Sequence, residues 1–554
     1  MYFTLAVSAA TREACAALTA AAERADPRVM PIPGPARVAW RAPGGRVAVL
    51  HWGDAPGPGA SQAGTSHAGT IWAEGATVHA RTGLARVDPV YRAEVAGAVV
   101  VSDRACWAAA ATGRLGDPDP AMAGAFLSLG YPVGDATPFR GVRALGGDRE
   151  LRLIDGRLGY APPGDARTAV VRAGAGDEGL AGAEAVARAL TEAVRPLGGA
   201  DPPAELSLTG GKDSRLVAAA LAAARVPFRA RTHGFAGHPD VVVAGLIAAK
   251  LGVEHTVTRP RPPGAPDEAD VLDRLRAAVL VSDGMLSAFE NLGSGFRPDP
   301  QAAGGPAETG GHGGELLRGG YAQAAWRRPA AAAAPLNAAA ATELFRRMTT
   351  RRLGLLRPGP ARAYLATLAP PAAALARGPL AALDDFYLAN RAGRWSAAAR
   401  QAYLLRSPLV QPLFADRVVR AARAVPLRDR MSDRLHRDVL GLLCPELLDL
   451  PLAGTPWHGQ PRTAATVLTV PPGAAAADWR RDYGDAVAGF LRGYVLDHGE
   501  TSPVFGIVRR RAAERLLRAP QADRQGAWAL ATLTALLSAD WLNAREPAGE
   551  ARHR

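Results

Sequence analysis

The chain has 554 residues, of which 48% are apolar, and can bury more than one hydrophobic core, so we expect two domains. Its three cysteines have no paired spacing, which argues against a disulfide framework or a zinc site. The net charge of +13 comes almost wholly from arginines spread along a sequence rich in Ala, Gly and Pro, with no basic cluster among aromatic residues, so coding bias explains it more simply than a nucleic acid partner does. The most apolar late stretch, residues 527–537, is too short to span a membrane and predicts a buried helix.

The N-terminal part of the sequence indicates β-structure. Residues 2–7 are typical of a strand and carry no basic segment of the kind that opens a signal peptide, so we expect a cytoplasmic protein. In residues 150–160, ELRLIDGRLGY, the pair Asp155-Gly156 between alternating residues predicts a β-hairpin. The Gly-rich stretch 162–179 then predicts a linker ahead of a helical run.

Residues 205–215, ELSLTGGKDSR, read as a short apolar strand, a glycine turn and the start of an apolar helix. Gly210 and Gly211 suit a turn whose amides wrap a phosphate, because such a turn needs positive φ and no Cβ against the ligand. The N-terminus of the following helix directs unpaired amides at the same anion. This stretch therefore predicts a phosphate-binding loop.

The polar residues around the two glycines fit the same interpretation. Asp213 can hold a divalent cation on the phosphate oxygens, and the hydroxyls of Thr209 and Ser214 can bond to them. A Walker loop is excluded, because Asp213 stands where that motif needs Ser or Thr, and its first glycine would fall at Leu206 inside the strand. The phosphate site must be of another type.

Two later stretches extend the pattern. Residues 229–256 read as a strand, a loop, an amphipathic helix and a second strand, which is the next βαβ step of a doubly wound parallel sheet. Residues 310–321, GGHGGELLRGGY, form a second glycine loop with one acidic residue, Glu315.

Residues 209–214 resemble the S-G-G-x-D-S loop of the ATP pyrophosphatases, the group that includes asparagine synthetase, β-lactam synthetase and the cyclases of lasso peptides. Residues 310–321 look like the second signature of asparagine synthetases, with Glu315 at the family's metal-binding Asp. The resemblance implies that the chain uses ATP and Mg²⁺, with Asp213 and Glu315 sharing the metal that neutralises the leaving pyrophosphate. It also implies an ATP site formed by Thr209, Gly210, Gly211, Asp213, Ser214, Thr232, His233, Gly234, Gly313 and Gly314.

Residues 99–107, 126–145 and 150–160 look like the glutaminase-type domain of asparagine synthetases. The resemblance implies an α/β protein in which residues 1–170 form an αββα sandwich. Residues 180–545 would then form the ATP-binding synthetase domain, with a doubly wound parallel sheet and a helical C-terminal part.

Two departures from the family affect the expected reaction. Glutaminases of this type use Cys at position 2, and here Tyr2 stands there, so the amine must come from elsewhere than glutamine. Asparagine and β-lactam synthetases carry a catalytic lysine shortly after a helix that ends in Pro-Glu, but residues 444–457, CPELLDLPLAGTPW, contain none. The chain has only Lys212 and Lys250, and neither stands at that place. Either an arginine stabilises the acyl-adenylate or the reaction differs from asparagine synthesis, so the catalytic residue is unknown.

The resemblance implies an ATP-dependent, AMP-forming amide synthetase that adenylates a carboxylate. Among members without the N-terminal cysteine, the lasso peptide macrolactam cyclases fit best: they join the N-terminal amine of a peptide substrate to an Asp or Glu side chain, and work with a leader peptidase and a precursor-recognition protein. The alternatives are an asparagine synthetase, a β-lactam synthetase and, from another class, a non-catalytic ATP- or peptide-binding homologue. The missing lysine and Glu315 favour the last of these, while the intact loop at 209–214 opposes it.

Overall fold

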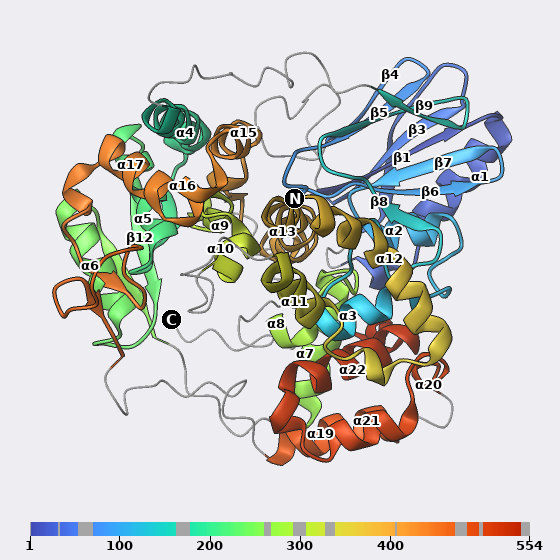
Figure 1. The fold of residues 1–554 in the computed structure, drawn as a ribbon. Coiled ribbons are helices and arrows are strands. Elements are labelled where there is room, and N and C mark those ends of the chain that lie inside the picture. The colour runs from blue at the N-terminus through green and yellow to red at the C-terminus, as the bar shows by residue number, and fades with distance from the viewer. Residues whose placement is uncertain are drawn as a thin grey trace.

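The structure is a computed structural model that describes ten segments of the chain. Its N-terminal sheets, its parallel sheet and its C-terminal helices occupy different regions of the molecule (Figure 1). The described residues are 2–30, 34–53, 70–161, 178–259, 268–291, 306–326, 338–404, 407–470, 485–497 and 502–544.

The N-terminal part contains two stacked antiparallel sheets. The larger has the order β2-β3-β1-β7-β6-β8, and the smaller the order β10-β9-β5-β4. The strands are β1 (Tyr2–Ala9), β2 (Ala36–Arg41), β3 (Val47–Gly53), β4 (Thr70–Glu74), β5 (Thr77–Thr82), β6 (Tyr91–Val95), β7 (Ala98–Ser102), β8 (Val142–Ala144), β9 (Arg149–Ile154) and β10 (Arg157–Ala161).

The predicted hairpin is confirmed. Strands β9 and β10 pair in antiparallel register on either side of Asp155 and Gly156. Both turn residues have positive φ, at 47° and 71°, as a two-residue hairpin turn that matches the twist of its strands requires.

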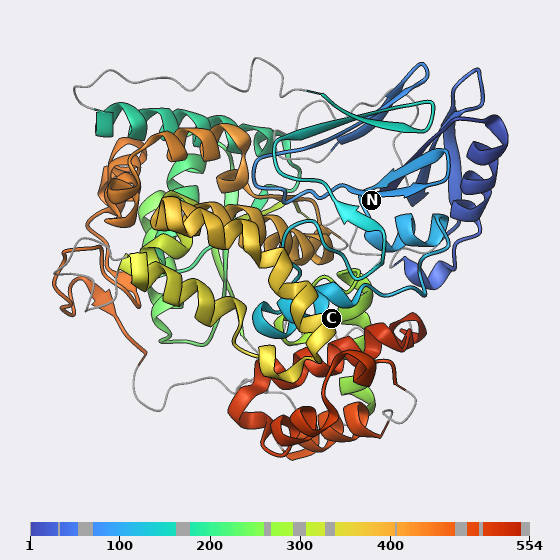
Figure 2. The same ribbon diagram turned by 45° about the vertical axis from the view of Figure 1, so that its right-hand side comes forward.

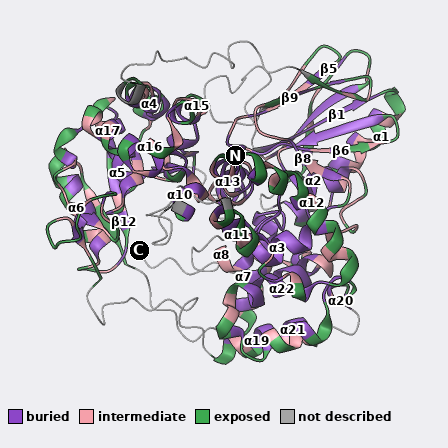
Figure 3. Ribbon diagram, in the orientation of Figure 1, coloured by how far each residue is buried: buried purple, intermediate pink, exposed green. Residues whose placement is uncertain are grey.

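Strand β7 shows how the larger sheet is buried on both faces (Figure 3). Val99 and Val101 lie in the core between the two sheets. Val100 points to the opposite face, into the core beneath α1 (Arg12–Glu23) and α2 (Ala105–Ala111). Since side chains alternate along a strand, a run of consecutive valines fills both cores at once.

The two stacked sheets of the expected αββα sandwich are present, with one helical layer on the larger sheet. On the smaller sheet, Leu151 and Leu153 face inward, while Arg152 and Ile154 are exposed. Among the described residues no helix covers that outer face, so the described sandwich has the layers α, β and β.

The second part is built on a five-stranded parallel sheet of order β13-β12-β11-β14-β15. The chain runs outward from β11 to β13 and then returns to β14 on the other side of β11, so the loops after β11 and β14 lie on either side of a topological switch point. Ligands of open α/β sheets bind at the carboxyl edge beside such a point. The strands are β11 (Ala204–Ser207), β12 (Phe228–His233), β13 (His255–Thr258), β14 (Glu308–Gly310) and β15 (Leu409–Val410).

Helices cover this sheet and share one core with it, as the doubly wound prediction requires. The expected linker at 162–179 lies outside the described residues up to residue 177, and its last two residues already belong to helix α4. The helices are α4 (Glu178–Val194), α5 (Lys212–Ala223), α6 (Pro239–Leu251), α15 (Asp416–Ala424) and α17 (Arg434–Leu443).

The C-terminal helices, in red in Figure 2, lie away from the parallel sheet. Residues 527–536 of α22 are all buried, which confirms the predicted buried helix. None of the described helices is long and apolar enough to cross a membrane. The further helices include α3 (Ala123–Leu129), α7 (Glu268–Val281), α8 (Ala288–Asn291), α10 (Gly320–Trp326), α11 (Ala338–Thr349), α12 (Pro358–Arg377), α13 (Pro379–Phe386), a π-helix (Tyr387–Ser396), α14 (Ala397–Leu404), α16 (Leu427–Met431), α19 (Asp485–Leu496), α20 (Val504–Ile507), α21 (Arg510–Leu517) and α22 (Arg524–Leu537).

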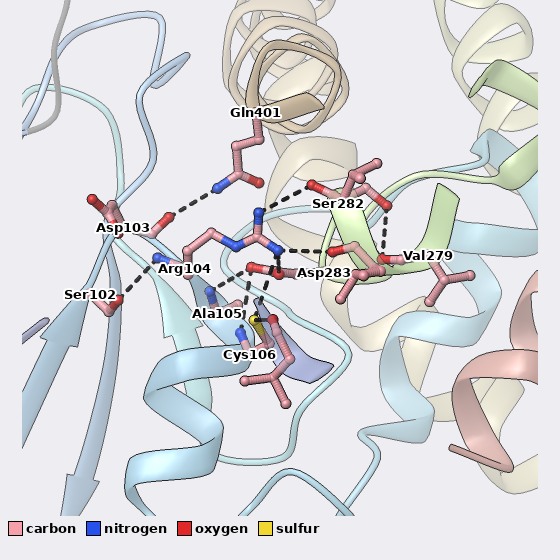
Figure 4. Close-up of polar contacts among 12 residues, drawn as sticks. Ser102, Asp103, Arg104, Ala105, Cys106, Val279, Ser282, Asp283 and Gln401 are labelled. Carbon is pink, nitrogen blue, oxygen red and sulfur yellow. Dashed lines mark hydrogen bonds and ion pairs between the residues drawn. The ribbon is translucent and has the colours of Figure 1, made fainter. Parts of the chain in front are cut away.

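An ion pair with no solvent exposure joins the N-terminal part to the rest (Figure 4). Arg104 precedes α2, and its guanidinium pairs with the carboxylate of Asp283, which follows α7. Asp283 also accepts a hydrogen bond of 2.8 Å from the amide of Ala105, and Arg104 donates one of 2.8 Å to the carbonyl of Leu280. The ion pair and these hydrogen bonds offset much of the cost of burying both charges, although Nε of Arg104 is buried without a partner.

Asp103, beside this pair, should make stability depend on pH. Burial raises its pKa to about 7 from 3.8, although the amide of Thr4 and the charge of Arg104 oppose the rise. The folded state therefore keeps a proton that the unfolded chain has lost, and stability should fall as the pH rises from about 4 through about 7. We expect a loss of about 1–2 kcal/mol between pH 5 and pH 8, less than the full shift implies because the residue is only partly shielded from solvent. Urea unfolding at both pH values checks this, and Asp103→Asn should show a smaller difference.

Candidate active site

The loop after β11 is closed by its own side chains. The amide of Thr209 donates to Ser214 Oγ at 3.0 Å, and the two hydroxyl oxygens also lie 3.0 Å apart. The amide of Gly211 donates to Thr209 Oγ1 at 3.3 Å. Helix α5 begins directly after Gly211, so its first-turn amides open at this loop.

Of the two glycines, Gly210 is required for a different reason than the one expected. Neither has a positive φ, so that expectation is wrong. Gly210 is needed for space, because a Cβ there would lie 2.6 Å from the Cβ of Ala453 and 2.8 Å from that of Val243. Its amide donates to Asp240 Oδ1 at 2.9 Å, at the start of α6. The loop is thus held against its neighbours from two sides.

The loop after β14 packs directly on the first one. A Cβ on Gly311 would lie 2.4 Å from the backbone nitrogen of Ser214, and one on Gly314 would lie 2.1 Å from Cγ of Asp213. Gly313 adopts positive φ, at 98°, immediately before the short helix α9 (Gly314–Leu317). Two glycine loops about a hundred residues apart in sequence therefore meet at the carboxyl edge of the parallel sheet.

The carboxylate of Asp213 has a partner on each oxygen. Oδ1 lies 2.9 Å from Nε2 of His436 on α17, and Oδ2 accepts a hydrogen bond of 2.6 Å from the guanidinium of Arg318. Burial raises the pKa of Asp213, but Arg318 and His436 outweigh it and bring the pKa below its ordinary value. Asp213 is therefore ionised at neutral pH and balanced by at least one fixed positive charge.

Glu315 lies on the same short helix as Gly314, with an exposed side chain. It interacts with Tyr387 of the π-helix, where burial and then the charge of Glu315 raise the pKa of the phenol. Tyr387 packs edge-on against Tyr321, whose hydroxyl lies 2.9 Å from that of Tyr131 in the N-terminal part. This acidic residue is thus next to a buried tyrosine cluster.

The donor set does not favour the expected metal pair. Mg²⁺ needs several oxygen ligands in octahedral geometry, whereas both oxygens of Asp213 already bond to nitrogen donors. A cation there would also face the guanidinium of Arg318. In the part of the chain that is described, no three His, Cys, Asp or Glu residues gather as a metal site would require. The sharing of Mg²⁺ by Asp213 and Glu315 stays a prediction.

Lys212 points into the segment where the family's lysine was expected. Its Nζ forms an ion pair of 2.6 Å with Asp433, donates to the carbonyl of Pro456 at 2.9 Å and lies 5.0 Å from the ring centroid of Trp457. Asp433 is fully buried and also accepts a hydrogen bond from Gln323. Lys212 is far from this segment in sequence but adjacent to it in space, where it ties the phosphate loop to residues 454–458.

The residues expected to bracket adenine lie at the end of β12, next to β11. The hydroxyl of Thr232 donates to the carbonyl of Leu208 at 2.7 Å and lies 2.8 Å from Nε2 of His255. The amide of Gly234 donates to the carbonyl of Thr258, while His233 is exposed. Their role toward a nucleotide stays a prediction.

Sequence reasoning missed three residues of this site. Arg318 lies inside the second glycine loop but reads there as an ordinary surface arginine, and His436 and Asp433 are more than two hundred residues from Asp213 and Lys212. No local pattern identifies His436 or Asp433, because α17 is brought to the loops by tertiary packing, including that against α4 and α5.

The comparison with known proteins identifies the family of the chain. The model of the asparagine synthase family matches residues 185–542, which include both glycine loops, the parallel sheet and the C-terminal helices. No curated protein gives a match. The chain therefore belongs to the asparagine synthase family, a class of ATP-dependent amide-forming synthetases.

Proposed function

We propose that this chain adenylates a carboxylate of a peptide with ATP and closes an amide bond within that peptide. The observation that carries the proposal is the direct packing of the two glycine loops, Gly311 on Ser214 and Gly314 on Asp213, at the switch point of the sheet. Such a junction is where open α/β sheets bind nucleotides, and the first-turn amides of α5 open there.

The roles of the residues follow from their positions. The loop of Thr209, Gly210, Gly211 and Ser214, together with Gly313 and Gly314, would hold the phosphates of ATP. The backbone at 232–234 would take the adenine. Mg²⁺ bound to the ATP phosphates would supply positive charge for the leaving pyrophosphate, and the chain's own residues would hold the phosphates in place.

The amine that attacks the acyl-adenylate would come from the substrate itself. Tyr2 replaces the cysteine by which glutaminases of this type release ammonia. An amine tethered to the activated carboxylate makes the step intramolecular, and this can supply a large part of the rate. A peptide macrolactam cyclase of the lasso type meets these conditions, and it would act with a leader peptidase and a precursor-recognition protein.

The expected result is release of pyrophosphate from Mg-ATP that depends on a linear peptide with a free N-terminus and an acidic residue several positions in. The peptide should lose the mass of one water. Pyrophosphate release with aspartate and ammonium in place of the peptide would instead indicate an asparagine synthetase.

A second candidate is a non-catalytic homologue that binds ATP or a peptide. The ion pair of Asp213 with Arg318 favours it, because it occupies the carboxylate that the family uses for metal. Binding of ATP without turnover on any of these substrates would support this candidate and contradict the synthetase.

A further inference from the structure

Arg318 has hydrogen-bonding capacity that the protein does not use. Its guanidinium donates to Asp213 at 2.6 Å, and its only other side-chain hydrogen bond among the described residues is a long one, 3.4 Å, to Gln323. Its Nε is buried and has no hydrogen-bond partner. Several other arginines also have a buried Nε without a partner, so Arg318 is distinguished by its place at the junction of the two glycine loops, beside the start of α5.

Asp213 holds that guanidinium at the phosphate loop. The carboxylate lies in the first turn of α5, between His436 on one oxygen and Arg318 on the other, and Gly314 packs against its Cγ. Burial lowers the pKa of Arg318, but Asp213 and Glu315 more than offset this and raise it, so the guanidinium stays charged. A fixed cation thus stands beside the helix N-terminus where phosphate is expected to bind.

A metal on Asp213 would have to displace this arrangement. It would break an ion pair in a mostly buried place and leave Arg318 without its carboxylate, next to a second cation. A guanidinium instead matches phosphate oxygens with two parallel N–H groups and needs no coordination sphere. Binding of an anion therefore leaves the ion pair of Arg318 and Asp213 intact, whereas binding of a cation to Asp213 breaks it.

We propose that Arg318 binds the terminal phosphates of the nucleoside triphosphate, and that Asp213 is its positioning residue rather than a metal ligand. This rests on the proposed function, which supplies the triphosphate. The sequence predicts that Mg²⁺ on Asp213 neutralises the phosphates. In this proposal the guanidinium of Arg318 supplies the positive charge at that place.

The test is calorimetric binding of inorganic pyrophosphate and of ATP, each with Mg²⁺ and with EDTA. The parent should bind pyrophosphate in EDTA within about threefold of its affinity in Mg²⁺. Arg318→Ala should weaken binding in EDTA at least about tenfold, since it removes the hydrogen bonds of a guanidinium to a charged phosphate. Arg318→Lys keeps the positive charge but lacks the two parallel N–H donors, so its affinity should lie between that of the parent and that of Arg318→Ala.

Arg276→Ala is the matched control. Arg276 on α7 pairs with Asp540 at 2.7 Å, and its side chain is 18% exposed against 17% for Arg318. It should bind both probes like the parent. Thermal unfolding of each variant shows whether it is folded before its affinity is compared.

Every other result contradicts the role of Arg318, the proposed function, or both. Binding that requires Mg²⁺, or that Arg318→Ala leaves unchanged in EDTA, overturns the role of Arg318 but not the synthetase. If the protein binds pyrophosphate but does not bind ATP, the phosphate-binding role of Arg318 is supported and the proposed function is contradicted. Binding of neither probe contradicts both.

Discussion

Gly311→Ala is expected to weaken ATP binding, and any ATP-dependent turnover, by at least about 100-fold, because a displacement of about 1 Å in a site can cost that much. The added Cβ would lie 2.4 Å from the backbone nitrogen of Ser214 and 2.8 Å from the backbone carbon of Asp213. No side-chain rotation relieves a clash with backbone, so the loop after β14 must move away from α5. Calorimetric titration with ATP measures the effect.

Gly359→Ala provides the control for this prediction. Gly359 lies in α12, its φ is not positive, and a Cβ there meets no atom within 4 Å. This variant should bind ATP like the parent, because alanine fits a helix better than glycine does. A folded Gly311→Ala protein with the affinity of the parent would show that the contact of the two loops is not what forms the nucleotide site.

Arg104→Met is expected to destabilise the protein by about 3–5 kcal/mol, the usual effect of removing one partner from a buried ion pair. Asp283 would keep its charge with no solvent exposure and lose the guanidinium. The effect should appear as a lower midpoint of urea unfolding. Because the pair joins the N-terminal part to α7, the loss should affect both parts of the molecule (Figure 4).

Two comparisons isolate the cause. Arg28→Ala removes a pair with Asp26 in which the side chains are 55% and 31% exposed, so stability should change far less than in Arg104→Met. Adding Asp283→Asn to Arg104→Met should cost less than the sum of the two single changes, because the uncompensated charge is then gone. Asparagine tolerates the positive φ of 52° at position 283. Strictly additive costs would mean that the pair does not interact.

The hairpin at Asp155 and Gly156 and the parallel sheet followed from the sequence alone. Turn residues and the period of apolar residues are local properties, and they specify local structure. The glycine loops were also recognisable, although the reason for Gly210 was not, because its neighbours Ala453 and Val243 come from other segments.

The sequence by itself determined the family, the kind of sheet and the two loops at which a nucleotide is expected. Only the tertiary structure decided what surrounds Asp213, because Arg318 and His436 reach it through the packing of α9 and α17. It also brought Lys212 to Pro456, across more than two hundred residues. Charges are read from a sequence one at a time, whereas the partner of a buried charge is set by which helices pack together, and that depends on the shape of the whole core.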